Sequence, residues 1–211
     1  ILGWNKPESG WRSCLQCCSK AAPGRKAYHM TYKVAYIIGS LSSNSINRKL
    51  VGAMIADAPA DLEFVEADFS KLPLYSPDYD ANYPQVATDF KKILEDADAV
   101  LIATPEYDRS IPGGLKNAID WFGRPWGSNP IGGKPVYVVG ASMGAVGAAA
   151  GQIATRQTLG FFNPLLMTQP EVFVKMSHED IGEDGRFIDA TTQGFVKSAI
   201  EAFADYIRTH A

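Results

Sequence analysis

The chain has 211 residues, of which 46% are hydrophobic and 20% charged, and this size and composition are typical of one globular domain rather than two. Residues 1–29 hold five basic residues and one acidic residue, so the remainder carries 15 basic and 22 acidic residues and a formal charge of −7. An acidic body disfavours nucleic-acid binding, which needs clustered lysine and arginine, and no apolar run approaches the roughly 18 residues of a membrane span.

Residues 1–29 show neither helical nor strand periodicity and lack the apolar segment of a secretory signal. The three cysteines, Cys14, Cys17 and Cys18, all lie here, and no second Cys or His pair follows at a zinc-finger distance, so we expect no metal site. We interpret this segment as disordered, either an organelle transit segment or an artificial or mistranslated extension. The folded domain is then residues 30–211, and its lack of thiols fits a reducing compartment such as the cytoplasm.

From residue 33 onward, short apolar runs alternate with longer amphipathic patterns. Strands are expected at residues 34–38, 62–67, 99–103, 136–140 and 171–174. Helices are expected at residues 45–57, 84–96, 113–122, 147–159 and 191–209. Runs such as VAYII and VYVVG are apolar throughout, as expected for strands that helices cover on both faces. The alternation predicts an α/β fold, a doubly wound five-stranded parallel sheet with helices on both faces.

Ligands of such a sheet bind outside the carboxyl ends of the strands, where the strand order reverses, so the loops after the first, third and fourth strands are the candidates. The first loop, residues 39–48, reads GSLSSNSINR and leads directly into a helix. It matches neither the G-x-G-x-x-G dinucleotide pattern nor the G-x-x-x-x-G-K-[ST] nucleotide pattern. Its hydroxyls and free backbone N–H groups at a helix start suit a monophosphate. The alternative is a polar turn with an N-cap.

The second loop and the helix after it, residues 105–121, contain the pattern P-E-Y-x-x-S-x-P-G-x-L-K-N-A-I-D-W. Together with G-S-L-S-x-x-S-x-N in the first loop, this pattern resembles the NAD(P)H-dependent FMN reductase family, which includes flavodoxin-like quinone, chromate and azo-dye reductases. The resemblance extends over about residues 32–211. The third loop, residues 140–147, is rich in small residues that let the backbone approach a flat ligand, although an ordinary strand-to-helix turn would look the same.

The resemblance implies a flavodoxin-like sheet of order 2-1-3-4-5 that binds FMN and uses NADPH or NADH as hydride donor. It implies a ping-pong oxidoreductase whose acceptor is a quinone or another small flat molecule, and a homodimer or homotetramer. No amino-acid side chain is expected to be catalytic, because the flavin carries the chemistry. The residues expected to contact the cofactor are Ser40, Ser42, Ser45, Ile46, Asn47, Pro105, Glu106, Tyr107, Asp108, Ser142, Met143 and Gly144.

Two positions depart from the family pattern, since Ser42 replaces an arginine that often assists phosphate binding and Asp108 stands where asparagine is common. Phosphate binding is then weaker or uses Arg48, and Asp108 either disfavours an anionic reduced flavin or merely caps the turn. Trp121 is expected to pack in the protein interior, to contact the flavin or to contact a partner subunit. The aromatic segment at residues 72–83 is either a wall of the site, a cover for a neighbouring subunit or a mobile loop.

The rival to an enzyme is a flavodoxin-type electron carrier without an NAD(P)H site of its own. A third alternative is a non-enzymatic protein that retains the fold. Three arginines are candidates for a 2′-phosphate of NADPH, namely Arg109, Arg124 and Arg156.

Overall fold

A computed structural model describes residues 30–211, and the interpretation of residues 1–29, with their three cysteines, lies outside this part of the chain. The strands are β1 (Tyr32–Ile38), β2 (Leu62–Glu66), β3 (Ala99–Ala103), β4 (Pro135–Ser142), β5 (Leu165–Met167) and β6 (Phe173–Lys175). The α-helices are α1 (Ile46–Ala56), α2 (Gln85–Glu95), α3 (Gly113–Phe122), α4 (Ala149–Leu159) and α5 (Ala190–His210). Three short 3₁₀ helices are η1 (Pro77–Ala81), η2 (Gly160–Phe162) and η3 (His178–Asp180).

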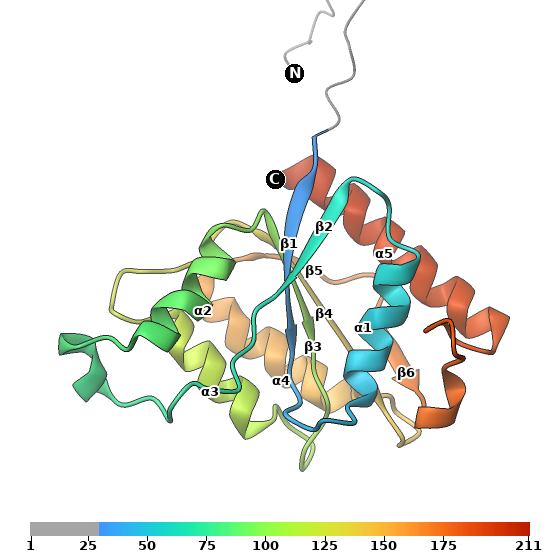
Figure 1. Ribbon diagram of the computed structural model, residues 1–211, viewed down its shortest axis with the longest axis horizontal. Coiled ribbons are helices and arrows are strands. Elements are labelled where there is room, and N and C mark those ends of the chain that lie inside the picture. Colours follow the sequence, from blue (N-terminus) through green and yellow to red (C-terminus); the bar gives the residue numbers. More distant parts are fainter. Residues whose placement is uncertain (1–29) are drawn as a thin grey trace, which may run out of the picture. The chain divides into compact units, whose positions relative to one another are not determined.

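The sheet is parallel and has the order β2-β1-β3-β4-β5, which confirms the expected doubly wound fold. Helices α1 and α5 cover one face, and α2, α3 and α4 cover the other (Figure 1). Two separate cores fill these layers, because each face of the sheet packs against its own set of helices. The five residues of β3 are fully buried, as expected for a central strand with a helix layer on each side.

The edge of the sheet beyond β4 differs from the expectation. One strand was expected at residues 171–174, but two short strands pair with β4: β5 opposite Pro135–Tyr137 and β6 opposite Gly140–Ser142. The chain between them contains Pro170, which has no backbone N–H to donate to the ladder. The edge strand is therefore interrupted, and β4 runs two residues further than expected, to Ser142.

The helices begin close to their predicted starts, with polar caps at two of them. The Ser45 side chain accepts the Arg48 N–H at the start of α1, and the Asp189 side chain accepts the Thr192 N–H at the start of α5. Along α5, Val196, Ile200, Phe203 and Ile207 recur at helical spacing and are all buried against the sheet. Within residues 30–211, no helix is both long and apolar enough to cross a membrane.

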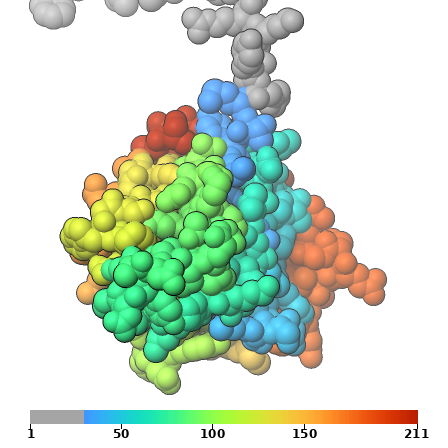
Figure 2. Space-filling model, turned by 60° about the vertical axis from the view of Figure 1, so that its left-hand side comes forward, coloured from blue at the N-terminus to red at the C-terminus, as the bar shows by residue number. Residues whose placement is uncertain are grey.

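The aromatic segment at residues 72–83 packs against α3. The Trp121 indole is buried and donates to the Pro73 carbonyl over 2.9 Å, and the rings of Tyr75, Tyr79 and Tyr83 surround it at 5.1, 5.4 and 5.3 Å. Trp121 is therefore a packing residue. The segment lies beside the 123–133 stretch on the surface (Figure 2), and Arg124 joins the two through an ion pair with Asp80.

Candidate functional site

The loops after β1, β3 and β4 leave the same edge of the sheet, at the bottom of Figure 1, because these three strands are parallel neighbours. Short contacts hold the bases of the loops together. The Gly39 N–H donates to the Ala103 carbonyl over 2.7 Å, and the Thr104 N–H donates to the Val139 carbonyl over 2.9 Å. The structure therefore brings together the three segments in which the cofactor-binding residues were expected.

The first loop presents backbone N–H groups whose hydrogen bonds are long. The N–H groups of Ser42, Asn44 and Arg48 each donate to a serine Oγ over 3.3 Å, beyond the usual range of such bonds. The acceptors are Ser40, Ser42 and Ser45. A ligand oxygen at about 2.9 Å would be a better acceptor for these donors, and the start of α1 adds the positive end of a helix dipole. The loop thus has the character of an anion site.

Asn47 joins two elements of the candidate site, because its carboxamide is buried and each of its polar atoms has a backbone partner. The Asn47 Nδ2 donates to the Ala141 carbonyl over 3.0 Å, and its Oδ1 accepts the Ala141 N–H over 2.9 Å. This pair ties the first turn of α1 to the end of β4. Ile46 beside it is half-buried against the core of the α1 face.

The second loop makes a tight turn after the buried Pro105. The backbones of Tyr107 and Ser110 exchange hydrogen bonds of 3.1 and 2.9 Å, and the two residues between them, Asp108 and Arg109, have φ values of 51° and 62°. Two consecutive left-handed residues form the type I′ turn that normally favours Asn-Gly or Asp-Gly. Asp108 tolerates this conformation better than Arg109 does, so the turn stores strain at its exposed tip.

Glu106 contacts the third loop region through its side chain. Its Oε2 accepts the backbone N–H groups of Ala150 and Gly151 at the start of α4, over 2.8 and 3.2 Å. The sequence pattern marked Glu106 as a cofactor contact but held no sign of this partner, which lies 44 positions away.

The third loop folds back on itself and exposes apolar side chains. The Ser142 Oγ accepts the Gly144 N–H over 2.9 Å, which closes the turn. Leu41, Tyr107, Met143 and Val146, from the three loops, are exposed by 61%, 51%, 67% and 59%. Large hydrophobic side chains exposed at the ligand edge of such a sheet, on the same loops as weakly bonded backbone N–H groups, suit a flat aromatic ligand.

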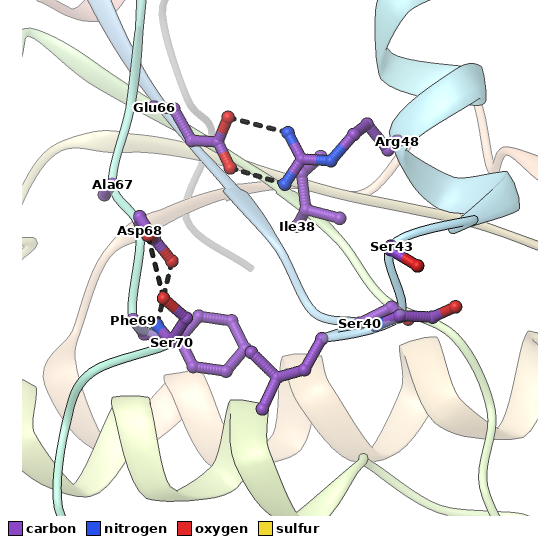
Figure 3. A pocket seen from close by; sticks show the side chains of 11 residues that line it. Ile38, Ser40, Ser43, Arg48, Glu66, Ala67, Asp68, Phe69 and Ser70 are labelled. Atoms are coloured by element: carbon purple, nitrogen blue, oxygen red, sulfur yellow. Dashed lines mark hydrogen bonds and ion pairs between the residues drawn. The ribbon is translucent and has the colours of Figure 1, made fainter.

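A polar pocket of about 440 Å³ lies beside the first loop, between the ends of β1 and β2. All eleven lining residues belong to 38–48 and 66–70. The first loop therefore borders both this pocket and the edge of the sheet where the three loops lie. Figure 3 shows Arg48 and Glu66 joined across it by two hydrogen bonds, both of 2.7 Å. The bond to Glu66 raises the pKa of Arg48, and the guanidinium is held away from the loop as half of an ion pair.

The three arginines considered for a 2′-phosphate differ in their contacts. Arg124 pairs with Asp80, and Arg156 pairs with Glu171 over 2.8 Å on the edge of the sheet near β6. Among residues 30–211, Arg109 has no ion pair, and it is exposed at the tip of the second loop. No group of three or more His, Cys, Asp or Glu residues in the same part of the chain is placed to hold a metal ion.

Comparisons with known proteins agree with this architecture. The model of the NADPH-dependent FMN reductase family matches residues 32–179. A 2-hydroxy-1,4-benzoquinone reductase of Burkholderia sp is 41% identical over 179 residues, 85% of this chain and 98% of the relative. A quinone reductase of Pseudomonas putida is 37% identical, over 84% of this chain and 95% of the relative. The solved flavoenzyme NAD(P)H:(acceptor) oxidoreductase of Paracoccus denitrificans has a TM-score of 0.82 and 38% identity, over 85% of this chain and 99% of that one.

Proposed function

Because the chain belongs to the NADPH-dependent FMN reductase family and is an oxidoreductase, we propose that it binds FMN across the three loops and transfers reducing equivalents from NAD(P)H to a quinone or a similar small acceptor. The observation that carries this proposal is the junction, at one edge of the sheet, of an anion-binding loop with exposed apolar side chains. A phosphate and an aromatic ring system are the two ends of FMN.

The residues of the first loop fit the phosphate. Ser40, Ser42 and Ser45 supply hydroxyls, and the N–H groups now bonded to them over 3.3 Å can turn to phosphate oxygens. Arg48 is the one basic side chain among residues 39–48, since Ser42 stands where the family often has arginine. Arg48 lies close by but remains paired with Glu66, so most of the binding would come from backbone N–H groups and the helix dipole.

The second and third loops fit the ring. The backbone from Pro105 to Asp108 offers N–H and C=O groups to a polar ring edge, and Tyr107 and Met143 offer apolar contact. When bound, FMN would accept hydride from NAD(P)H and pass the electrons on to the acceptor. The chain would position the ring and stabilise charge at its polar edge through backbone N–H groups. One open apolar surface favours donor and acceptor binding in turn, as in a ping-pong mechanism.

The decisive experiment is to load the purified protein with FMN and record its spectrum, then follow NADPH and NADH oxidation with 1,4-benzoquinone as acceptor. We expect a yellow protein that bleaches with the donor and turns over with quinone, and parallel double-reciprocal plots when both substrates are varied. A protein that binds FMN but oxidises neither donor would be an electron carrier instead. Failure to bind FMN at micromolar concentration would exclude both.

We also propose that the protein works as a homodimer. Trp126 and Phe161 are exposed by 77% and 72%, with rings 6.4 Å apart, beside an apolar groove of about 420 Å³. The groove is also lined by Lys116 and Asp120 of α3, and a surface with both charges can pair with a second copy of itself about a two-fold axis. The expectation of a cytoplasmic protein stays a prediction.

A further inference from the structure

Glu106 lies in the second loop, yet its carboxylate caps a helix that begins more than forty residues later. The N–H groups of Ala150 and Gly151 belong to the first turn of α4, where backbone donors have no partner within the helix. The residue before this helix, Ala148, provides no side-chain cap of its own. Glu106 is therefore the side chain that caps α4.

The backbone of the second loop also rests directly on this helix. A Cβ atom at Gly151 would lie 2.7 Å from the Pro105 carbonyl oxygen, closer than packed atoms allow, and 3.0 Å from the Cα atom of Glu106. Only glycine lets the first turn of α4 come so near. The peptide between Pro105 and Glu106 is thus held by contact with α4 and by the Glu106 side chain.

We propose that Glu106 is a positioning residue, which fixes the ring-binding loop on α4 and whose negative charge makes the site bind reduced FMN less tightly than it otherwise would. This inference rests on the proposed function, because it concerns the residues proposed to hold the ring. It assigns to Glu106 a task separate from direct contact with the cofactor.

The Glu106 carboxylate makes the start of α4 an unfavourable place for a further negative charge. The start of a helix carries about half a positive charge, which would favour an anionic ring close by. A full carboxylate on the same N–H groups more than offsets it, so the neighbourhood of residues 105–106 is negative. Reduced FMN with a deprotonated ring carries one more negative charge than oxidised FMN, and like charges in a partly buried site repel.

Two substitutions separate the positioning from the charge. Glu106→Gln keeps an oxygen that can accept both N–H groups but removes the charge, whereas Glu106→Ala removes both. Glu63→Gln is the matched control, because Glu63 is an exposed carboxylate of β2 that lies opposite Lys33, at the other end of the strands.

The experiment measures the dissociation constants of oxidised and reduced FMN and the midpoint potential of the bound flavin, for the full chain and each variant. For Glu106→Gln we expect oxidised FMN to bind as in the parent and reduced FMN to bind about tenfold more tightly, which raises the two-electron potential by about 30 mV. For Glu106→Ala we expect oxidised FMN to bind about tenfold more weakly, as expected when two hydrogen bonds are lost. Reduced FMN should bind about as in the parent, because the lost charge offsets the lost hydrogen bonds. Glu63→Gln should change neither quantity.

Each failure has its own meaning. A Glu106→Gln protein with the parent's potential would refute the charge effect. A Glu106→Ala protein that is folded by circular dichroism and binds oxidised FMN as the parent does would refute the positioning role. If Glu106→Ala is unfolded, Glu106→Gln still decides the charge effect, and loss of fold upon losing this cap itself supports the positioning role. A parent protein without affinity for FMN would instead refute the proposed function.

Discussion

At the scale of single residues, Asn47 shows how one buried side chain can join two elements of the candidate site. Both polar atoms of its carboxamide bind the backbone of Ala141, at 3.0 and 2.9 Å, inside the protein. Asn47→Ala would leave a buried N–H and a buried carbonyl without partners. We expect a loss of about 2–4 kcal/mol in the free energy of unfolding, measured by urea denaturation. Asn44→Ala, in the exposed part of the same loop, should change it by less than about 0.5 kcal/mol.

The strained turn of the second loop contains a residue whose replacement should not lower the free energy of unfolding, in contrast to Asn47→Ala. Arg109 has a φ of 62°, a conformation that costs an L-residue about 1 kcal/mol and glycine nothing. Arg109→Gly should therefore leave the fold equally stable or stabilise it by up to about 1 kcal/mol, as thermal unfolding would show. If the exposed guanidinium binds the 2′-phosphate of NADPH, the same variant raises the KM for NADPH and leaves the KM for NADH unchanged. Destabilisation by 1 kcal/mol or more would show that Arg109 makes contacts that outweigh the strain.

At the scale of helices and strands, the sequence predicted the elements that are long and strongly patterned. The five helices and four of the strands lie where periodicity placed them, within a few residues. The fifth position in the sheet was harder to predict, because β5 and β6 have three residues each and three residues show no period. Pairing with β4, not local sequence, makes them strands.

The two helix caps provide a test of the phosphate loop with an internal control. Ser45 caps α1 within the proposed phosphate site, and Asp189 caps α5, a helix outside that site. Ser45→Ala and Asp189→Ala should each lower the free energy of unfolding by about 1 kcal/mol. Only Ser45→Ala should also weaken FMN binding, by about tenfold, measured through quenching of flavin fluorescence. Equal FMN affinity in the two variants would place the phosphate elsewhere.

Asp57, at the end of α1, links this helix to α5 and makes the link sensitive to acid. It accepts Gln193 Nε2 over 2.7 Å and Arg186 Nε over 3.0 Å, and the hydrogen bond from Gln193, followed by that from Arg186, lowers the pKa of the Asp57 carboxyl below its usual 3.8. A lowered folded-state pKa means that this stabilisation is present above about pH 4 and is lost as the pH falls through the folded-state value.

Asp57→Asn should accordingly be less stable than the parent at pH 7, because the amide group of asparagine faces a second donor. The difference in the free energy of unfolding should remain constant down to about pH 5 and shrink below pH 4, measured by urea denaturation across that range. Glu183→Gln, at an exposed position, provides the comparison. A difference that stays constant down to pH 3 would assign the effect to packing.

At the scale of the whole described domain, the sequence indicated which loops form the candidate site but not which contacts hold these loops together. The topology rule for parallel sheets placed the three loops at one edge, and the family pattern named their residues. The ties that hold the loops, Asn47 to Ala141 and Glu106 to Ala150, join residues 94 and 44 positions apart. Partners so distant leave no trace in local spacing, so the sequence pattern held no sign that Asn47 and Glu106 bind the backbone of β4 and α4.

Self-association is the prediction that concerns the molecule as a unit. Trp126 and Phe161 together form an exposed apolar pair beside a groove, and burying such a surface between two copies removes it from water. Phe161→Lys places a charge at its centre, and we expect a monomer in sedimentation experiments at concentrations where the parent is a dimer. Ile188→Lys is the control, because Ile188 is exposed by 70% but lies near α5 and outside the groove. A dimer that survives Phe161→Lys and dissociates with Ile188→Lys would move the interface to the opposite layer of helices.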